Sequence, residues 1–441
     1  MAHSHSLNHK IWQIAWPAIL SNISIPLLGL VDTAILGHLD STVYLGAVAI
    51  GASILSFLYW GFGFLRMGTT GLVARALGAG DKPRELSLVL QSIVLALALA
   101  IMVVMLHPLW LGLGLWLMEP GPALAPLSES YVSIRVYSAP AVLVTYAIVG
   151  WFIGRQNTRW PMLFVIITNA LNIVLDILFI VILDMKSDGA ALATLSAEYV
   201  GAILAVWALV RNLDWSPLPQ IRAQLIQLRA YRDLLDSNRY LFVRTMCLLF
   251  SFAFFTAMST RLGENTLVAN TIMLQLLMMT AYALDGFAYA AEGLTGNAVG
   301  AGDLKRLYQV VAACARWSII TAVAISATLL LAGPLLYPVF THHIEILQLL
   351  DKYHFWLVLM PLAAVWSYLL DGVFIGTAQS RYMMRGMIFS LLVVYMPAWY
   401  LLKGYGNHGL WLAFILFNAA RGASLQWYYQ RLSRRSAWLL P

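Results

Sequence analysis

Long apolar stretches alternate with short polar connections along the whole chain. A helix needs about 20 apolar residues to cross the hydrocarbon core of a bilayer, and twelve stretches reach that length. They cover about 11–36, 43–74, 86–107, 127–153, 161–183, 188–210, 233–260, 265–296, 307–332, 347–376, 382–402 and 408–430. The pattern predicts an all-α integral membrane protein with twelve transmembrane helices.

The two halves of the chain repeat three short motifs in the same order. "TTGLVARALGAGD", ending at Asp81, aligns with "AEGLTGNAVGAGD", ending at Asp303, and "GWFIGRQNTR" from Gly150 aligns with "GVFIGTAQSR" from Gly372. Both pairs have the same offset, half of the chain, and "DGAALA" from Asp188 resembles "HGLWLA" from His408 at nearly that offset. Because this offset contains six spans, it predicts two pseudo-symmetric six-helix bundles related by an axis along the membrane normal.

One extended polar connection separates the two halves. We therefore predict an N-terminal six-helix lobe over residues 1–210, a cytoplasmic inter-lobe linker over 211–232 and a C-terminal six-helix lobe over 233–441. Pro217 and Pro219 break any helix early in the linker. The Leu and Ile spacing that follows predicts an amphipathic helix on the membrane surface.

Composition limits the function classes that remain. The chain is 61% hydrophobic and only 11% charged, against roughly 25% charged residues in a soluble domain. The net charge of +7 comes from dispersed loop residues, so it indicates membrane orientation rather than nucleic-acid binding. The sequence contains no phosphate-loop, nucleophile or zinc motif. We therefore expect no enzyme activity, no cofactor and no ATP-driven pump.

Basic residues are distributed unequally between the two sets of loops. The tails and the loops after even-numbered spans contain Lys10, Arg75, Lys82, Arg84, Arg155, Arg159, Arg211, Arg222, Arg229, Arg232, Lys305, Arg306, Arg381, Arg385, Arg431, Arg434 and Arg435. The other loops contain only Lys186, Arg261, Lys352 and Lys403. By the positive-inside rule, both termini and the first set are cytoplasmic.

A carboxylate interrupts the first apolar span in "IPLLGLVDTAILGHLD". An ionisable residue there costs roughly 2.5–3.5 kcal/mol on insertion scales, so it usually faces a cavity or a partner. Counting residues along the helices, at the regular rise of an α-helix, puts Asp32, Asp176 and Thr194 at a similar depth in the outer half of the membrane. Asn169 and Asn172 share one helix face with Asp176 through their i, i+3, i+7 spacing.

Two kinds of ion chemistry are open to this polar group. Two neighbouring carboxylates in a low-dielectric site should not both stay ionised, so Asp32 and Asp176 would bind a proton. Alternatively, their oxygens, with those of Asn172 and Thr194, could enclose Na⁺. The plainer alternative is structural, with Asp32 as a hydrated helix-end residue and the other groups making ordinary interhelical hydrogen bonds.

The repeat predicts that the second half lacks this acid pair. Asp32 maps onto Phe255 and Asp176 onto Ala398, so the ion site is expected in the N-terminal half.

Asn169, Glu198, Asp285 and Asp371 remain as a secondary set of polar residues within spans. Asp371 lies near the cytoplasmic end of its span and could be a gate or helix-end residue. Asp285 could be a second proton site, or it could pair with an intramembrane arginine such as Arg66, Arg244 or Arg421. Glu198 has the same two interpretations.

The first span also contains residues that favour bending. Pro17 and Pro26 each remove a backbone hydrogen bond, and Gly29 adds flexibility close to Asp32. A static kink would explain these residues as well as a hinge does. If the span moves, protonation of Asp32 would bias it between two conformations.

Taken together, "PAILSNISIPLLGLVDTAILGHL", the paired "GAGD" loops and the two six-helix halves resemble the multidrug and toxic compound extrusion (MATE) transporters. The DinF-like prokaryotic subfamily is the most similar, and "LVDTAILGHL", "NALNIVLD" and "ALDGFAYAAE" are the most specific segments. The resemblance implies secondary active efflux of cationic or amphipathic organic compounds in exchange for H⁺ or Na⁺ by alternating access. It also implies that Asp32, Asn172 and Asp176 couple the ion.

The resemblance sets the expected partners and location as well. We expect small organic or cationic drugs as substrates, contact with membrane lipid, no nucleic-acid partner, function as a monomer and a place in the inner (plasma) membrane. The main alternative is a flippase for a lipid-linked substrate, which should have a basic cavity for pyrophosphate, whereas the intramembrane signals here are acidic. A channel or receptor would explain neither the repeat nor the asymmetric acid pair.

The loop charges generate a direct test of topology. An epitope tag at either terminus should be protected in intact cells and become accessible once the membrane is permeabilised. Tags that are detected on opposite faces of the membrane would contradict an even number of spans.

Overall fold

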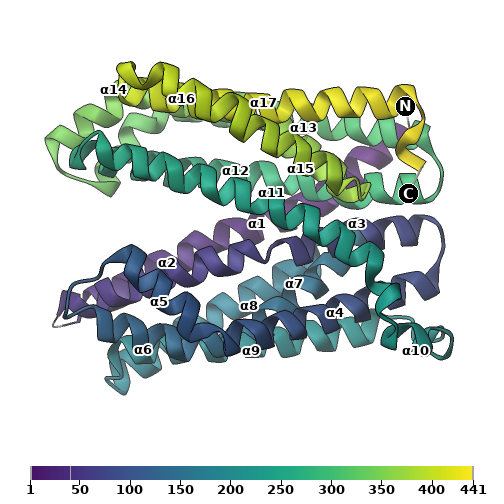
Figure 1. Ribbon diagram of the computed structural model, residues 1–441, viewed down its shortest axis with the longest axis horizontal. Helices are drawn as coiled ribbons and strands as arrows, with labels where there is room; N and C mark the ends of the chain where they lie inside the picture. Colours follow the sequence, from purple (N-terminus) through teal and green to yellow (C-terminus); the bar gives the residue numbers. More distant parts are fainter. Residues whose placement is uncertain (1, 40, 440–441) are drawn as a thin grey trace. The chain divides into compact units, whose positions relative to one another are not determined.

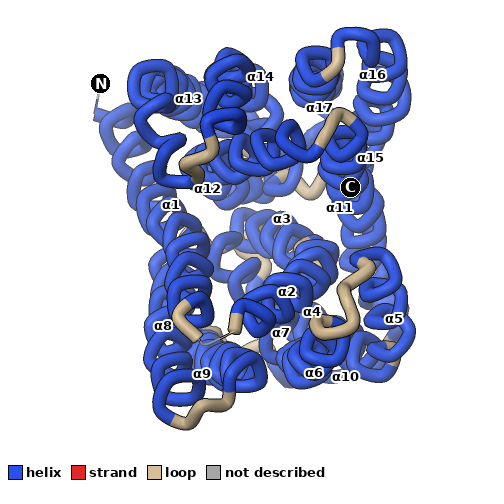
Figure 2. Tube along the Cα trace, turned by 90° about the vertical axis from the view of Figure 1, so that its left-hand side faces the viewer, coloured by secondary structure: helices blue, strands red, loops and turns tan. Residues whose placement is uncertain are grey.

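The structure is a computed structural model that describes residues 2–39 and 41–439. Within these ranges the regular secondary structure is entirely helical (Figure 2). Eleven of the described helices are long and apolar enough to cross a membrane. The twelfth long helix, α17 (Asn407–Arg434), is more polar because it carries residues such as Asn418 and Arg421. The predicted twelve-helix membrane fold is confirmed.

The helices of the first half cover the predicted spans, although the second and the fourth spans are each divided into two helices (Figure 1). Its elements are α1 (Ala2–Gly37), α2 (Thr42–Gly61), α3 (Phe64–Gly78), α4 (Lys82–Met105), α5 (His107–Met118), α6 (Ala125–Arg135), η1 (Val136–Ser138), α7 (Ala139–Gly154), α8 (Arg159–Asp176), η2 (Ile177–Ile182) and α9 (Lys186–Asn212). The sequence analysis did not predict α5, whose 12 residues are too few to cross a bilayer.

The predicted fourth span is two helices rather than one. α6 ends at Arg135, a 3₁₀ turn over Val136–Ser138 follows, and α7 begins with Pro140 in its first turn. Proline is tolerated in the first turn of a helix but not in its interior, so Pro140 fixes where the second helix starts. Hydropathy averaged over the span does not reveal this break.

The second half has the same order of long helices. Its elements are α10 (Leu218–Ile226), η3 (Leu228–Tyr231), α11 (Arg232–Arg261), α12 (Glu264–Gly300), α13 (Leu304–Phe340), α14 (Ile344–Gly376), α15 (Ser380–Phe389), η4 (Ser390–Tyr395), α16 (Met396–Leu402), η5 (Lys403–Tyr405), α17 and η6 (Ala437–Leu439). The predicted eleventh span is therefore a composite of α15, a π-helical segment and α16.

The predicted linker contains the expected short helix. In α10, Pro219 lies in the first turn, and the buried Ile221 belongs to the face that packs on α4. Lys82 Nζ, at the start of α4, forms an ion pair with Asp214 of the linker at 2.9 Å. Hydrogen bonds from Ser216 and the contact with Lys82 lower the pKa of Asp214 to about 2, so this carboxylate stays ionised at cellular pH.

Two compact units divide the described chain. Within the described residues, one comprises 2–19, 74–80 and 236–439, and the other comprises 20–39, 41–73 and 81–235. The segments up to residue 19 and over 74–80, which the prediction gave to the N-terminal lobe, belong to the unit that contains the second half of the chain. The predicted lobe and linker boundaries at 210 and 233 stay predictions. In the first unit α12, α13 and α14 pack on one another and α14 packs on α17. In the second unit α8 packs on α9, α4 on α7, and α6 on both α2 and α9.

The repeated "GAGD" motif starts a helix in each half. The carboxylate of Asp81 accepts a hydrogen bond from the backbone N–H of Arg84, and Asp303 does the same for Arg306, both at 2.9 Å. The glycine before each aspartate has a positive φ, 69° in one copy and 72° in the other, which favours glycine. The motif thus supplies a turn and an N-cap.

The "GWFIG" and "GVFIG" motifs encode a close helix crossing in each half. A Cβ atom on Gly150 of α7 would lie 2.5 Å from the backbone oxygen of Arg66 in α3. A Cβ atom on Gly372 of α14 would lie 2.5 Å from the backbone oxygen of Ala288 in α12, and one on Gly376 would lie 2.2 Å from a backbone oxygen of the same helix. Only glycine permits so close an approach, as in other small-residue helix contacts in membranes.

This contact predicts a steric effect at Gly376. Gly376→Ala should destabilise the protein by about 1–3 kcal/mol, the usual cost of overpacking a dense core, and lower the thermal denaturation midpoint in detergent. Gly112→Ala in α5 is the matched control, because nothing lies within 4 Å of a Cβ atom there. Equal midpoints for the two variants would contradict the close-crossing interpretation.

Candidate functional site

Polar side chains of α1, α8 and α9 meet within the compact unit formed by residues 20–73 and 81–235. Asn172 Nδ2 of α8 donates a hydrogen bond to Thr194 Oγ1 of α9 at 3.1 Å. Asn169 Nδ2, one turn earlier on α8, donates to the backbone oxygen and the hydroxyl of Ser24 in α1, at 3.3 and 3.2 Å. The polar face of α8 therefore contacts both neighbouring helices.

Asp32 and Asp176 interact directly through their carboxyl groups. A hydrogen bond between two carboxyl groups needs a proton on one of them, since an ionised carboxylate is only an acceptor. Asp176 and Asn172 are each 1% exposed. Asp32 Oδ1, Asp176 Oδ2 and Asn172 Oδ1 are buried without a hydrogen-bond partner among the described residues. Buried acceptors in this state are uncommon, and such oxygens can take a proton or a hard cation.

The backbone changes at Asp176. This residue is the last of α8, and residues 177–182 continue as a π-helix, in which the Leu183 N–H bonds the carbonyl of Leu178 at 3.0 Å. Single π-helical turns inside α-helices occur frequently at functional sites. No pattern in the sequence predicted this irregularity.

Arg135 is a buried member of the group that the sequence analysis missed. It is 8% exposed, and its Nη2 donates to Glu198 Oε1 at 2.9 Å. A charged residue inside the predicted fourth span, in "YVSIRVYSAP", was the available signal. Of the two interpretations of Glu198, the structure shows pairing with an arginine.

The second half of the chain has aromatic rings at the aligned positions. Phe255 aligns with Asp32, and in the register of "DGAALA" with "HGLWLA" Phe414 aligns with Thr194. The two rings are buried with their centroids 5.0 Å apart, and Ala398, which aligns with Asp176, packs against the same hydrophobic cluster. The polar residues of the first half are thus replaced by a packed apolar core.

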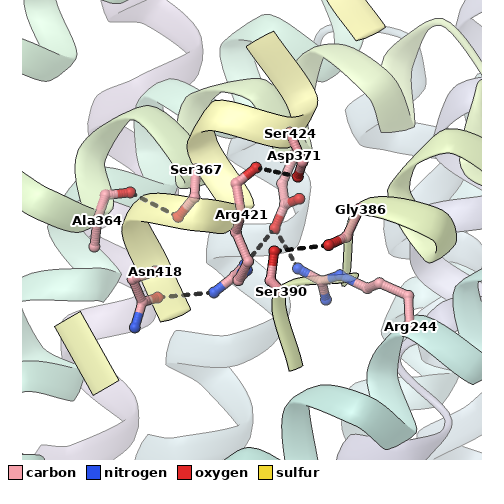
Figure 3. A network of polar contacts seen from close by, with 9 residues as sticks. All are labelled: Arg244, Ala364, Ser367, Asp371, Gly386, Ser390, Asn418, Arg421 and Ser424. Carbon is pink, nitrogen blue, oxygen red and sulfur yellow. Dashed lines mark hydrogen bonds and ion pairs between the residues drawn. The ribbon is translucent and has the colours of Figure 1, made fainter. Parts of the chain in front are cut away.

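Asp371 of α14 is held between two arginines (Figure 3). Its Oδ2 accepts hydrogen bonds from Arg421 Nη2 of α17 at 2.8 Å and from Arg244 Nη2 of α11. All three residues are buried. Arg421 Nη1 also donates to Asn418 Oδ1 at 3.0 Å. The sequence analysis treated Asp371 as a gate or helix-end residue, and the structure shows it tying three helices together.

Asp285 keeps its two interpretations. Of the arginines named as its possible partners, Arg66, Arg244 and Arg421, the last two bind Asp371. Asp285 lies close enough to Tyr368 for their charges to interact, and Tyr368 also interacts with the Asp371 group. A role as a second proton site stays a prediction.

The hinge residues all lie in α1, which is one continuous helix over Ala2–Gly37. Nothing lies within 4 Å of a Cβ atom built on Gly29, so packing does not explain the glycine. The Thr33 hydroxyl donates to the Gly29 carbonyl at 2.7 Å, a back-bond that often bends helices slightly. Bending at Pro17, Pro26 or Gly29 stays a prediction.

The arginine clamp on Asp371 predicts a strong effect on stability. Asp371→Asn removes the negative charge that Arg244 and Arg421 share. Leaving buried guanidinium groups without their carboxylate typically lowers the free energy of unfolding by about 3–5 kcal/mol. Thermal denaturation in detergent should therefore occur at a clearly lower temperature. Asp32→Asn serves as the control and should keep the wild-type midpoint or exceed it, because it removes one of two neighbouring acids. A wild-type midpoint for Asp371→Asn would refute the structural role.

Comparison with known proteins fits this architecture. The MatE family model matches residues 17–178 and 241–401. The DNA damage-inducible protein F of Escherichia coli K12 is 39% identical over 443 residues, covering 99% of this chain and 95% of that protein. Multidrug and toxin extrusion protein 1 of Danio rerio is 28% identical, covering 67% of this chain and 50% of that protein.

Solved structures agree on the fold. A crystal structure of a mutant of the Vibrio cholerae MATE transporter VcmN matches with a TM-score of 0.87 over 100% of both chains, at 21% identity. At this identity the match shows a shared fold and nothing about shared chemistry. The family model, with the 39% identical relative, shows more: the chain belongs to the MatE family of transporters, as its resemblance to DinF-like proteins predicted.

Proposed function

We propose that the protein is a secondary active efflux transporter that exchanges cationic or amphipathic organic compounds for H⁺ by alternating access. The observation that carries the proposal is the pair of neighbouring carboxyl groups of Asp32 and Asp176, each with one buried oxygen that lacks a hydrogen-bond partner among the described residues. Family membership supports transport, and the Danio rerio relative is named for multidrug and toxin extrusion. We further propose that the chain works as a monomer in the inner membrane, with both termini cytoplasmic.

The contacts favour H⁺ over Na⁺ as the coupling ion. A shared proton explains why two carboxyl groups adjoin in a buried place, because both could not remain ionised there at low cost. Na⁺ is the second candidate, since the partnerless oxygens of Asp32, Asn172 and Asp176 could act as ligands. The fourth oxygen of that set, Thr194 Oγ1, already donates to the Ala190 carbonyl at 3.0 Å and accepts from Asn172.

Exchange follows from competition for one negative charge. When the acid pair carries an extra proton, a cationic compound loses its electrostatic attraction to the site and can leave. When the proton is released, the ionised pair attracts the next cation. The charge change occurs on α1, close to Gly29 and the Thr33 back-bond, so it can bias that helix between straight and bent forms.

The flippase alternative fits the site less well. A lipid-linked pyrophosphate needs unpaired basic groups, whereas the acid pair would repel an anion. The neighbouring Arg135 is already paired with Glu198 at 2.9 Å. Efflux of cations is therefore the better match to the described residues.

The acid pair predicts the outcome of an efflux assay. Asp32→Asn keeps the side-chain volume but cannot ionise, so the variant should insert normally and lose dye uptake driven by an acid-inside pH gradient in inverted vesicles. Asp176→Asn should lose most uptake as well. Ala398→Ser, at the aligned position of the other half, is the matched control and should retain it.

The same assay separates the coupling ions. Uptake of a fluorescent organic cation after a pH jump in sodium-free buffer is the expected result. Uptake that needs a sodium gradient instead would favour the Na⁺ alternative. Wild-type uptake by Asp32→Asn at matched expression would remove Asp32 from the coupling machinery, and equal losses at Asp176 and Ala398 would favour a site shared by both halves.

A further inference from the structure

The linker between the two halves presents two apolar side chains, Ile226 and Leu228, beside two arginines. We propose that this turn docks on the membrane surface, with Ile226 and Leu228 in the interfacial region and Arg222 and Arg229 on the headgroups of anionic phospholipids. The surface is made of other residues than the polar group of α1, α8 and α9, so it does not depend on the proposed function.

The apolar pair is unusually exposed. Ile226, the last residue of α10, and Leu228, the first of η3, are 86% and 85% exposed, the highest values among the large hydrophobic side chains that the structure describes. The next values, 79%, belong to Leu331 and Val339 of α13, a helix long and apolar enough to cross a membrane. Such side chains on a spanning helix contact lipid, and the same environment would cover Ile226 and Leu228.

The side of α10 that includes Ile226 faces away from the protein. Ile221 is buried on the side that packs on α4. At about 100° per residue, Ile226 lies about 140° around the helix from Ile221. Arg222 is exposed and lies one turn before Ile226 on the same side. The free face of α10 therefore combines a basic and an apolar side chain.

The linker also has positive charge that the protein does not neutralise. The two acids on either side of α10 in the sequence, Asp214 and Asp233, are each paired with a basic residue at the start of α4, at 2.9 and 2.6 Å. Arg222 and Arg229 are exposed and have no ion-pair partner in the described part of the chain. Their charges are thus available to a partner outside the protein.

The turn that presents these side chains is fixed within the fold. The hydroxyl of Tyr231, a buried residue at the end of η3, donates to the backbone carbonyl of Leu225 in α10 at 2.9 Å. The two ion pairs with α4 hold the segment on both sides of this turn. A surface that is ordered before binding loses less conformational freedom when it binds.

Two tryptophans indicate that α10 starts at the level of the lipid headgroups. Trp207, near the end of α9, is 46% exposed, and the guanidinium of Arg211 lies 5.2 Å from the centre of its ring. Trp215 is 38% exposed and donates through Nε1 to the Val210 carbonyl at 3.1 Å. Exposed tryptophans are enriched at both membrane–water interfaces. α10 begins at Leu218, directly after this belt.

The chemistry of the surface favours an anionic phospholipid. Apolar side chains next to basic ones are typical of segments that lie in the membrane interface, and guanidinium groups bind phosphate oxygens well. A zwitterionic lipid offers phosphate without net charge, whereas each basic residue near an anionic surface strengthens binding by about fivefold. A specific protein partner would need a larger complementary surface than this turn provides.

The test measures lipid contact at single positions of the linker. Cys247 and Cys314 are replaced by alanine, and a fluorescent bimane label is attached to Ile226→Cys, Leu228→Cys or Gln224→Cys. The protein is placed in nanodiscs whose lipids carry bromine on the upper part of the acyl chains. Bromine should quench the first two labels strongly. Gln224 is the matched control, because it is exposed and lies on the opposite side of α10 from Ile226.

Lipid composition tests the role of the arginines. Changing from phosphatidylcholine to a mixture with phosphatidylglycerol should increase quenching at positions 226 and 228. Arg222→Gln or Arg229→Gln should each lower the ratio of docked to undocked linker by about fivefold in the anionic mixture. The double variant should lose the response to phosphatidylglycerol. All substituted linker residues are exposed, so the variants should fold.

Labels at positions 226 and 228 that are quenched no more than the label at 224 would overturn the proposal and leave the apolar pair to a protein partner. Quenching that neither phosphatidylglycerol nor the arginine substitutions change would overturn the assignment of anionic lipid. The readout is fluorescence rather than transport, so a failure of the proposed H⁺ exchange would leave these results unaffected.

Discussion

The placement of two carboxyl groups inside a helical membrane bundle constrains everything around them. Water is scarce at that depth, so each charge needs a proton, a cation or a fixed donor. The surrounding helices provide only part of this: α9 provides Thr194 as a partner for Asn172, while the nearby Arg135 of α6 is paired with Glu198. The oxygens that remain without partners are those that an exchangeable ion would use. Buried polar atoms without a partner also occur elsewhere, for example at Gln91 and Asn238, so what distinguishes this site is that its partnerless oxygens belong to two neighbouring acids and an amide.

One polar network in the second half, around Asn270, has all of its side-chain amide groups hydrogen-bonded. Asn270 donates to Ser259 and Asn407 at 2.7 Å, and its oxygen accepts from Asn407 and Trp411 at 2.9 Å. Such a network specifies one arrangement of helices and has no capacity left for an ion. The repeat preserved what the backbone needs, namely the "GAGD" caps and the glycine crossings. Side chains without a backbone role diverged, so Phe255 stands where the first half has Asp32.

The sequence predicted the features that depend on regular geometry. Apolar length located the spans because a bilayer has a fixed thickness. Counting helix rise placed Asp176 and Thr194 at a similar depth, and in the structure Thr194 bonds Asn172, one helical turn from Asp176. It failed where partners come from distant helices, as with Arg244 and Arg421 around Asp371. Averaged hydropathy also hid the local irregularities, the break before Pro140 and the π-helix after Asp176, because these depend on hydrogen bonding of single residues.

The arrangement of charges also determines how strongly proton and substrate can influence each other. Two ligands that bind the same negative charge are coupled, and each must weaken the other by the same factor. In the proposed exchange a proton and an organic cation compete for the charge of Asp32 and Asp176, so the coupling between them equals the attraction for the cation that protonation removes. A site whose carboxyl groups all stayed ionised, or all stayed protonated, would bind the two ligands independently and could not exchange them.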